Sequence, residues 1–281
     1  MKNIVYLAYR ISRPRFWLYL AGPYIVGYAA GISKQSQFLS VPFILQLLYF
    51  LFPANVLLYG INDLFDSDTD AKNTKKGTKE HRLKPSDIKI LKIIIGITYT
   101  LSFAMLVLQK NIIDSSLFTL FLVLSIIYST PPIRLKAKPF LDFSSNILYA
   151  LPGFLAYHQI TNTVPPLTII IAAFCWTGAM HLFSAIPDIL VDKKAGIMTT
   201  AVYLGQKKSL ILCSVLWGIT VALILSKLFP WSLLALLYPL IPLLVLTKKI
   251  NLTNIYWKFP YITAALGMLL FLIIFLAKPY A

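Results

Sequence analysis

The feature that most constrains the fold is a series of apolar runs of about 20 residues, which recur along the whole chain. Such a run is long enough for a helix to cross the ~30 Å hydrocarbon core of a bilayer. The runs are continuous, whereas the strands of a membrane barrel alternate apolar and polar residues over about ten positions. We therefore expect an all-α polytopic membrane protein, with one domain over residues 1–281 and about nine transmembrane helices. The expected spans are residues 16–32, 39–61, 88–108, 112–130, 140–158, 164–187, 209–226, 229–246 and 260–276.

The distribution of charge predicts how the chain is oriented in the membrane. The sequence is 58% hydrophobic and only 13% charged, yet its net charge is +16. Of its 26 Lys and Arg residues, 22 fall before the first expected span, in alternate connections after it or in the first turns of the span over residues 88–108. The positive-inside rule then places the N-terminus and these loops in the cytoplasm and the C-terminus outside, in a bacterial or archaeal cell membrane. We expect no nucleic-acid partner, because that role needs a soluble basic face.

The ten acidic residues are few, so their positions are informative. Nine lie on the expected cytoplasmic side, and Asp114 is the exception. Six form two clusters, one at the end of the second expected span and one at the end of the sixth. Within each cluster the spacing is helical, so the carboxylates share a helix face. The residues that share these faces are Asp63, Asp66 and Asp70 at i, i+3 and i+7, and Asp188 and Asp192 at i and i+4, and the sixth clustered acid is Asp68.

Carboxylates packed this densely repel one another, and a charge at membrane depth costs several kcal/mol unless it is paired. A divalent cation between the two clusters removes both problems. Hard oxygen ligands suit Mg²⁺, and no His or Cys accompanies them as a zinc site would require. The alternative is a solvated acidic turn, which explains one cluster more readily than two on the same face.

Basic residues flank these clusters and have two interpretations. The loop over residues 71–84 either anchors to anionic lipid headgroups or contacts a diphosphate held by the metal. A second basic loop follows the fourth expected span, and Arg13 and Arg15 precede the first with aromatic neighbours typical of an interfacial anchor. The candidates for diphosphate contact are Lys72, Lys75, Lys76, Arg82, Arg134, Lys136 and Arg15.

These motifs resemble those of a known family. Asn62-Asp63-x-x-Asp66-x-x-x-Asp70 resembles the first aspartate-rich motif of UbiA-type prenyltransferases, and Asp188-x-x-x-Asp192 resembles the second. Residues 128–136 are similar to the basic loop that follows the fourth helix in that family. The resemblance implies a UbiA-like helical bundle whose active site opens at the cytoplasmic side. It also implies Mg²⁺-dependent transfer of a prenyl group from an allylic diphosphate to a lipophilic acceptor within the membrane.

The resemblance also implies roles for individual residues. The five aspartates would hold Mg²⁺ on the donor's diphosphate, and Asn62 would orient a carboxylate or a metal-bound water. Aromatic faces can stabilise the allylic cation, and Tyr59 and Tyr128 lie beside the motifs. Asn55 belongs to the same polar stripe as Tyr59 and Asn62, although hydrogen bonding between helices explains it equally well.

A finer resemblance concerns the acceptor. Asp70-Ala-Lys-Asn73 and Ala185-Ile-Pro187-Asp188 look closest to the lycopene elongase branch, which makes C50-type carotenoids. The expected acceptor is therefore a carotenoid such as lycopene. Two alternatives stay open at this point: an aromatic prenyltransferase acting on a quinone precursor, haem or chlorin, and a transporter of divalent cations or phosphorylated solutes.

Overall fold

A computed structural model describes residues 2–66 and 83–277, and every regular element in that part of the chain is a helix. The all-α prediction is therefore confirmed. The chain divides into two compact units. Unit 1 comprises residues 1–134, 151–164 and 274–281, and unit 2 comprises residues 135–150 and 165–273.

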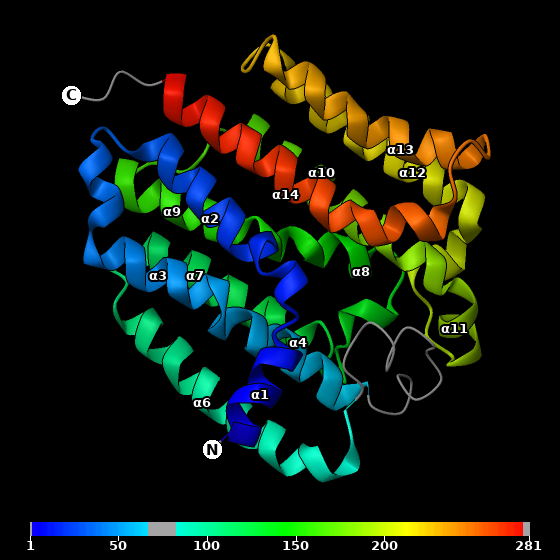
Figure 1. The fold of residues 1–281 in the computed structure, drawn as a ribbon, viewed down its shortest axis with the longest axis horizontal. Helices are drawn as coiled ribbons and strands as arrows, with labels where there is room; N and C mark the ends of the chain where they lie inside the picture. The colour runs from blue at the N-terminus through cyan, green and yellow to red at the C-terminus, as the bar shows by residue number, and fades with distance from the viewer. Residues whose placement is uncertain (1, 67–82, 278–281) are drawn as a thin grey trace. The chain divides into compact units, whose positions relative to one another are not determined.

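Unit 1 carries the first aspartate motif. Its long helices are apolar because their sequences are apolar runs with few interruptions. Figure 1 shows α2 alongside α9, and α3 continuing into α4. The helices are α1 (Lys2–Ile11), α2 (Leu18–Gly31), α3 (Val41–Leu51), α4 (Pro53–Phe65), α6 (Ile88–Val107), α7 (Ile112–Ile127) and α9 (Leu151–Thr161).

A close contact between two glycines joins α2 to α9. A Cβ atom on Gly27 would lie 2.1 Å from the backbone oxygen of Gly153, so no side chain fits between the two backbones. Small residues allow membrane helices to approach in this way. The contact fixes α9 against α2 within unit 1.

The second expected span, residues 39–61, is divided into α3 and α4 by a break at Phe52. Pro53 begins α4, where its missing N–H costs nothing. The side-chain amide of Asn55 donates to the carbonyl oxygens of Phe50 and Leu51 at 2.9 and 3.0 Å. These bonds satisfy carbonyls that the helix break leaves open, and they support the interhelical interpretation of Asn55.

Unit 2 carries the second aspartate motif and is built around a buried aromatic cluster. The ring centroid of Trp217 lies within 5.8 Å of those of Phe183, Tyr238 and Phe259. The helix containing Trp217 begins earlier than expected and has a non-helical residue at Gly205, with φ of 73°. The helices are α8 (Leu141–Ser144), α10 (Leu167–Ala185), α11 (Ile189–Lys194), α12 (Thr200–Leu225), α13 (Leu237–Leu246) and α14 (Leu252–Ala277).

Length and hydropathy identify helical segments that can cross a membrane. Among the described residues, five are long and apolar enough, and two shorter apolar segments accompany them. The expected span over residues 140–158 is divided between α8, a 3₁₀ turn and α9. The total of nine spans stays a prediction. The five long segments are Val41–Phe65, Pro85–Val107, Leu167–Lys194, Thr200–Leu225 and Leu252–Ala277.

Candidate active site

The first motif lies where α4 ends. Asp63 is in the last turn of the helix and is 1% exposed, while Asp66 follows the last helical residue and is 4% exposed. The backbone N–H of Asp66 still donates to the carbonyl of Asn62 at 3.0 Å, but its φ and ψ of −108° and 3° are not helical. The predicted helical stripe therefore ends before Asp66. Both carboxylates are nevertheless buried at the same end of α4.

An arginine contacts each of these carboxylates. Nη2 of Arg13 lies 2.7 Å from Oδ1 of Asp63, and Nη2 of Arg134 lies 3.0 Å from Oδ1 of Asp66. Both arginines have positive φ, 50° and 40°, which is uncommon for residues other than glycine. Arg134 was expected near a diphosphate, whereas the sequence indicated only an anchoring role for Arg13. No local pattern marks a pair separated by 50 positions.

Aromatic and amide groups complete this region of unit 1. The guanidinium carbon of Arg13 lies 4.7 Å from the ring centroid of Tyr59, a buried residue one turn before Asp63. The amide of Asn62 donates to Ser129 Oγ at 3.0 Å and so ties the end of α4 to the residues after α7. Tyr128 is the C-terminal cap of α7 and precedes that serine.

The remaining predicted residue of this unit is Arg15. Its guanidinium lies over the ring of Phe16, with 4.5 Å between the guanidinium carbon and the ring centroid. The centroid of Phe16 is 5.9 Å from that of Tyr59. The expected contact of Arg15 with a diphosphate stays a prediction.

Several predicted residues lie outside the part of the chain that the structure describes. They fall between α4 and α6 in the sequence, and their predicted roles stay predictions. These residues are Asp70, Lys72, Lys75, Lys76 and Arg82.

The second motif is in unit 2, directly after α10. Asp188 ends a short 3₁₀ helix, Ile186–Asp188, and Asp192 lies in α11, so the two are at the expected spacing of four residues. Both are half-buried. Lys136, in the 3₁₀ helix Leu135–Ala137, is also half-buried and within electrostatic range of His181 in α10.

A buried carboxylate that the sequence did not single out supports the second motif. Asp142 Oδ2 accepts a hydrogen bond from the backbone N–H of Thr200 at 2.7 Å, and Oδ1 accepts one from the Thr200 hydroxyl. The same hydroxyl accepts from the backbone N–H of Phe140 at 2.6 Å. Asp142 is fully buried. It fixes the start of α12, a few residues after Asp192, to the start of α8.

The donor set of the first motif fits a hard divalent cation. Asp63 and Asp66 offer buried carboxylate oxygens, and no sulfur or imidazole ligand belongs to the motif. Among residues 2–66 and 83–277, no three His, Cys, Asp or Glu side chains form a group that could hold a metal ion. A complete Mg²⁺ site would therefore combine this pair with further ligands or with substrate oxygens.

Comparison with known proteins identifies the family. A family model described as the UbiA prenyltransferase family matches residues 20–259. This chain belongs to the UbiA prenyltransferase family. It is therefore a prenyltransferase, and its apolar helices are those of an integral membrane protein.

The curated relatives of this UbiA prenyltransferase include lycopene elongase/hydratases. One is the "Lycopene elongase/hydratase" of Haloferax volcanii, 38% identical over 268 residues, which are 95% of this chain and 88% of that protein. Another, of the same name, is from Haloarcula japonica and is 38% identical over 265 residues, 94% of this chain and 89% of that protein.

The fold also matches solved structures. A UbiA homolog from Archaeoglobus fulgidus, bound to DMAPP and Mg²⁺, is 25% identical and superposes with a TM-score of 0.74. The match covers 94% of this chain and 98% of that one. The UbiA-like fold that the sequence predicted is confirmed.

Proposed function

We propose that this prenyltransferase transfers a dimethylallyl group from its diphosphate to a carotenoid such as lycopene, with Mg²⁺ as cofactor. The observation that carries this assignment is the extended similarity to lycopene elongase/hydratases, at 38% identity over 95% of the chain. The buried aspartate pair at the end of α4 supplies the matching chemistry.

Each motif has a part in holding the donor. Asp63, Asp66 and Asp70 from the first motif, with Asp188 and Asp192 from the second, are the proposed Mg²⁺ ligands. The bound cation would neutralise charge that develops on the departing diphosphate. Asn62, held by Ser129, keeps the neighbouring carboxylate in place. Basic residues that reach the outer phosphate oxygens add to this stabilisation. The proposed residues are Arg134, Lys136, Arg15, Lys72, Lys75, Lys76 and Arg82.

The reaction begins when the C–O bond of the donor breaks and the diphosphate leaves with the electron pair. The remaining allylic cation needs an environment that excludes water. Tyr59 is buried in unit 1. Tyr59 and Tyr128 are proposed to present their aromatic faces to the allylic cation, and each cation–π contact would stabilise it by about 0.5–2 kcal/mol. An alkene of the acceptor then attacks, a C–C bond forms, and the charge passes to the acceptor. Loss of a proton or addition of water completes the reaction.

The proposed orientation places the motifs and basic loops in the cytoplasm. Its support is the asymmetric distribution of Lys and Arg described above. A soluble diphosphate donor would then enter from the cytoplasmic side, while the carotenoid would enter from the lipid. Both substrates would meet beside the first aspartate motif, where α4 ends.

The test is an assay of membranes containing the protein. These receive dimethylallyl diphosphate, Mg²⁺ and lycopene, and pigment mass is followed beside an Asp66→Ala control. We expect a Mg²⁺-dependent gain of one or two C5 units that is absent from the control. Prenylation of an aromatic acceptor, with no change in lycopene, would keep the family and overturn the carotenoid assignment.

A further inference from the structure

The two ion pairs of the first motif place positive charge where a metal cation would bind. We propose that Arg13 and Arg134 are counter-ions of the metal-free enzyme, which hold the carboxylates of Asp63 and Asp66 until a divalent cation displaces them. This inference rests on the proposed function in one respect only, that these carboxylates bind the metal.

Burial explains why the carboxylates need such partners. The side chains of Asp63 and Asp66 are 1% and 6% exposed. An ionised carboxylate at this depth of an apolar helix is costly unless an opposite charge lies next to it. The guanidinium groups of Arg13 and Arg134 supply that charge at 2.7 and 3.0 Å. The two guanidinium groups therefore compensate the charge of the buried carboxylates.

The same contacts oppose metal binding. A cation bound at Oδ1 of either aspartate would lie within a few ångströms of a guanidinium, where like charges repel strongly. The arginines are the more exposed partners, at 17% and 28%, so they have a path away from the site. Their positive φ values also place strain in the backbone that aims them, as is frequent in ligand clamps. Displacement of the arginines is therefore easier than movement of the buried aspartates.

Arg13 has a second effect, because its guanidinium covers a face of Tyr59 at 4.7 Å. That ring is proposed to stabilise the allylic cation. When the metal displaces Arg13, the ring face is uncovered in the same step. The site therefore presents an open aromatic face only after it has bound the metal cation, which promotes ionisation of the diphosphate donor.

Displacement also couples the metal to the diphosphate. Each released guanidinium carries a positive charge that an anionic diphosphate can neutralise in place of the carboxylate. Metal and diphosphate should therefore strengthen each other's binding, as reciprocity of coupling requires. Metal alone should bind weakly.

The experiment measures metal binding and not turnover. Purified protein in detergent is titrated with Mn²⁺ as a paramagnetic substitute, without diphosphate, and free Mn²⁺ is read by electron paramagnetic resonance. We expect Arg13→Gln and Arg134→Gln to bind Mn²⁺ at least about fivefold more tightly than the unchanged protein, the lower end of typical coupling. Arg10→Gln, an exposed residue one turn before Arg13, removes the same charge and should change nothing. Unchanged or weaker Mn²⁺ binding in both site variants would overturn the proposal.

One further variant, Arg13→Lys, tests whether charge is responsible, and the second site variant guards against misfolding of the first. Arg13→Lys keeps the positive charge and is expected to bind Mn²⁺ as weakly as the unchanged protein, so tightening equal to that of Arg13→Gln would contradict a charge effect. Arg134→Gln lies at the more exposed pair and decides the matter if Arg13→Gln does not fold. Tighter Mn²⁺ binding by the variants, together with no prenyl transfer by the unchanged protein, would leave this inference standing and reject the proposed function alone.

Discussion

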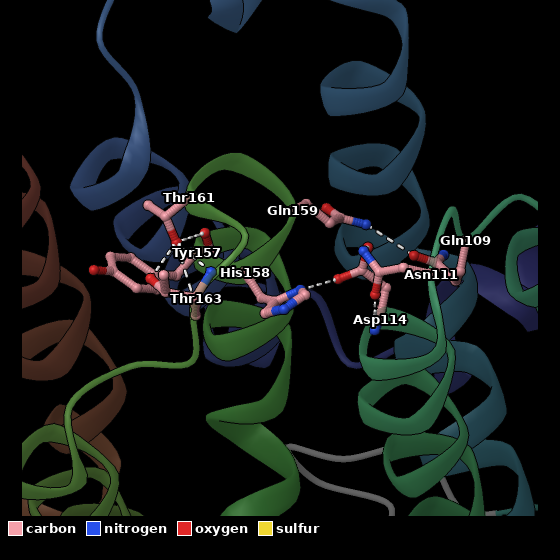
Figure 2. Close-up of polar contacts among 8 residues, drawn as sticks. All are labelled: Gln109, Asn111, Asp114, Tyr157, His158, Gln159, Thr161 and Thr163. Carbon is pink, nitrogen blue, oxygen red and sulfur yellow. Dashed lines mark hydrogen bonds and ion pairs between the residues drawn. The ribbon is translucent and has the colours of Figure 1, made fainter.

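His158 Nδ1 lies 2.7 Å from Oδ1 of Asp114, and both residues are buried, at 2% relative exposure each. The pair joins α9 to the first turn of α7, where Asn111 caps the helix and donates to the other carboxylate oxygen at 2.9 Å. Figure 2 shows the two side chains pointing toward each other, with Gln159 reaching Gln109 beside them. Ser129, which contacts the first motif, follows Asp114 by 15 residues along α7 and the residues after it. At the rise of a helix, about 20 Å therefore separates the His158–Asp114 pair from the motif.

That distance predicts a structural role for the pair. Replacing His158 by Ala removes the buried partner of Asp114 Oδ1 and leaves that carboxylate with the hydrogen bond from Asn111, a loss that typically costs about 3–5 kcal/mol for a broken buried pair. We expect a large fall in the melting temperature measured in detergent, with Mn²⁺ affinity unchanged in the fraction that remains folded. Gln159→Ala removes only the neutral bond to Gln109 and should cost about 1 kcal/mol. Equal melting temperatures for the two variants would contradict this prediction.

The contact between α2 and α9 gives a second prediction. In Gly27→Ala the new Cβ would meet the Gly153 oxygen, so the two helices must separate. Overpacking of this kind costs about 1–3 kcal/mol, which thermal unfolding in detergent would detect. The matched control is Gly22→Ala in the same helix, where a Cβ meets nothing within 4 Å. That variant should be as stable as the parent or slightly more stable, because alanine favours helix.

How much of this fold the sequence predicts depends on the range of the interaction. Apolar runs predicted α6 and α7 to within a few residues, because each helix is defined by its own stretch of chain. The division of residues 39–61 was missed, although Pro53 marked a place where a helix can begin. A continuous hydropathy average conceals such a break.

The site shows the same limit. Asp63 and Asp66 were identified from their spacing, and both are buried at one helix end. Their partners Arg13 and Arg134 are 50 and 68 positions away, and only the packing of α1 and the post-α7 loop against α4 brings them there. The sequence showed Arg13 as an interfacial anchor because its neighbours are aromatic. Local pattern thus finds the acids and not their counter-ions.

The contact between Thr200 and Asp142 gives a third prediction. Thr200→Val removes the hydroxyl that bonds both Asp142 and the Phe140 N–H, and leaves two buried groups with one bond fewer. We expect a loss of about 1–3 kcal/mol in the free energy of unfolding. Thr200→Ser keeps the hydroxyl and should recover most of the stability in the same denaturation experiment. Equal stability of the Val and Ser variants would show that the hydroxyl bonds contribute little.

Asp192 and Asp142 are both aspartates of unit 2, but their replacement by Asn should affect stability and prenyl transfer differently. Asp142 is fully buried and saturated by Thr200, so Asp142→Asn is expected to destabilise the protein. Asp192 is only half-buried, so Asp192→Asn should lower the melting temperature less than Asp142→Asn does. Its carboxylate is a proposed Mg²⁺ ligand, and its loss should lower prenyl transfer by about 10²–10³-fold, the usual effect of removing a group that stabilises developing charge. The measurements are thermal unfolding and prenyl transfer on the same preparations, with Asp87→Asn in unit 1 as the charge-matched control. Full activity in Asp192→Asn would remove this residue from the metal site, and a matching loss of stability would assign it a structural role like that of Asp142.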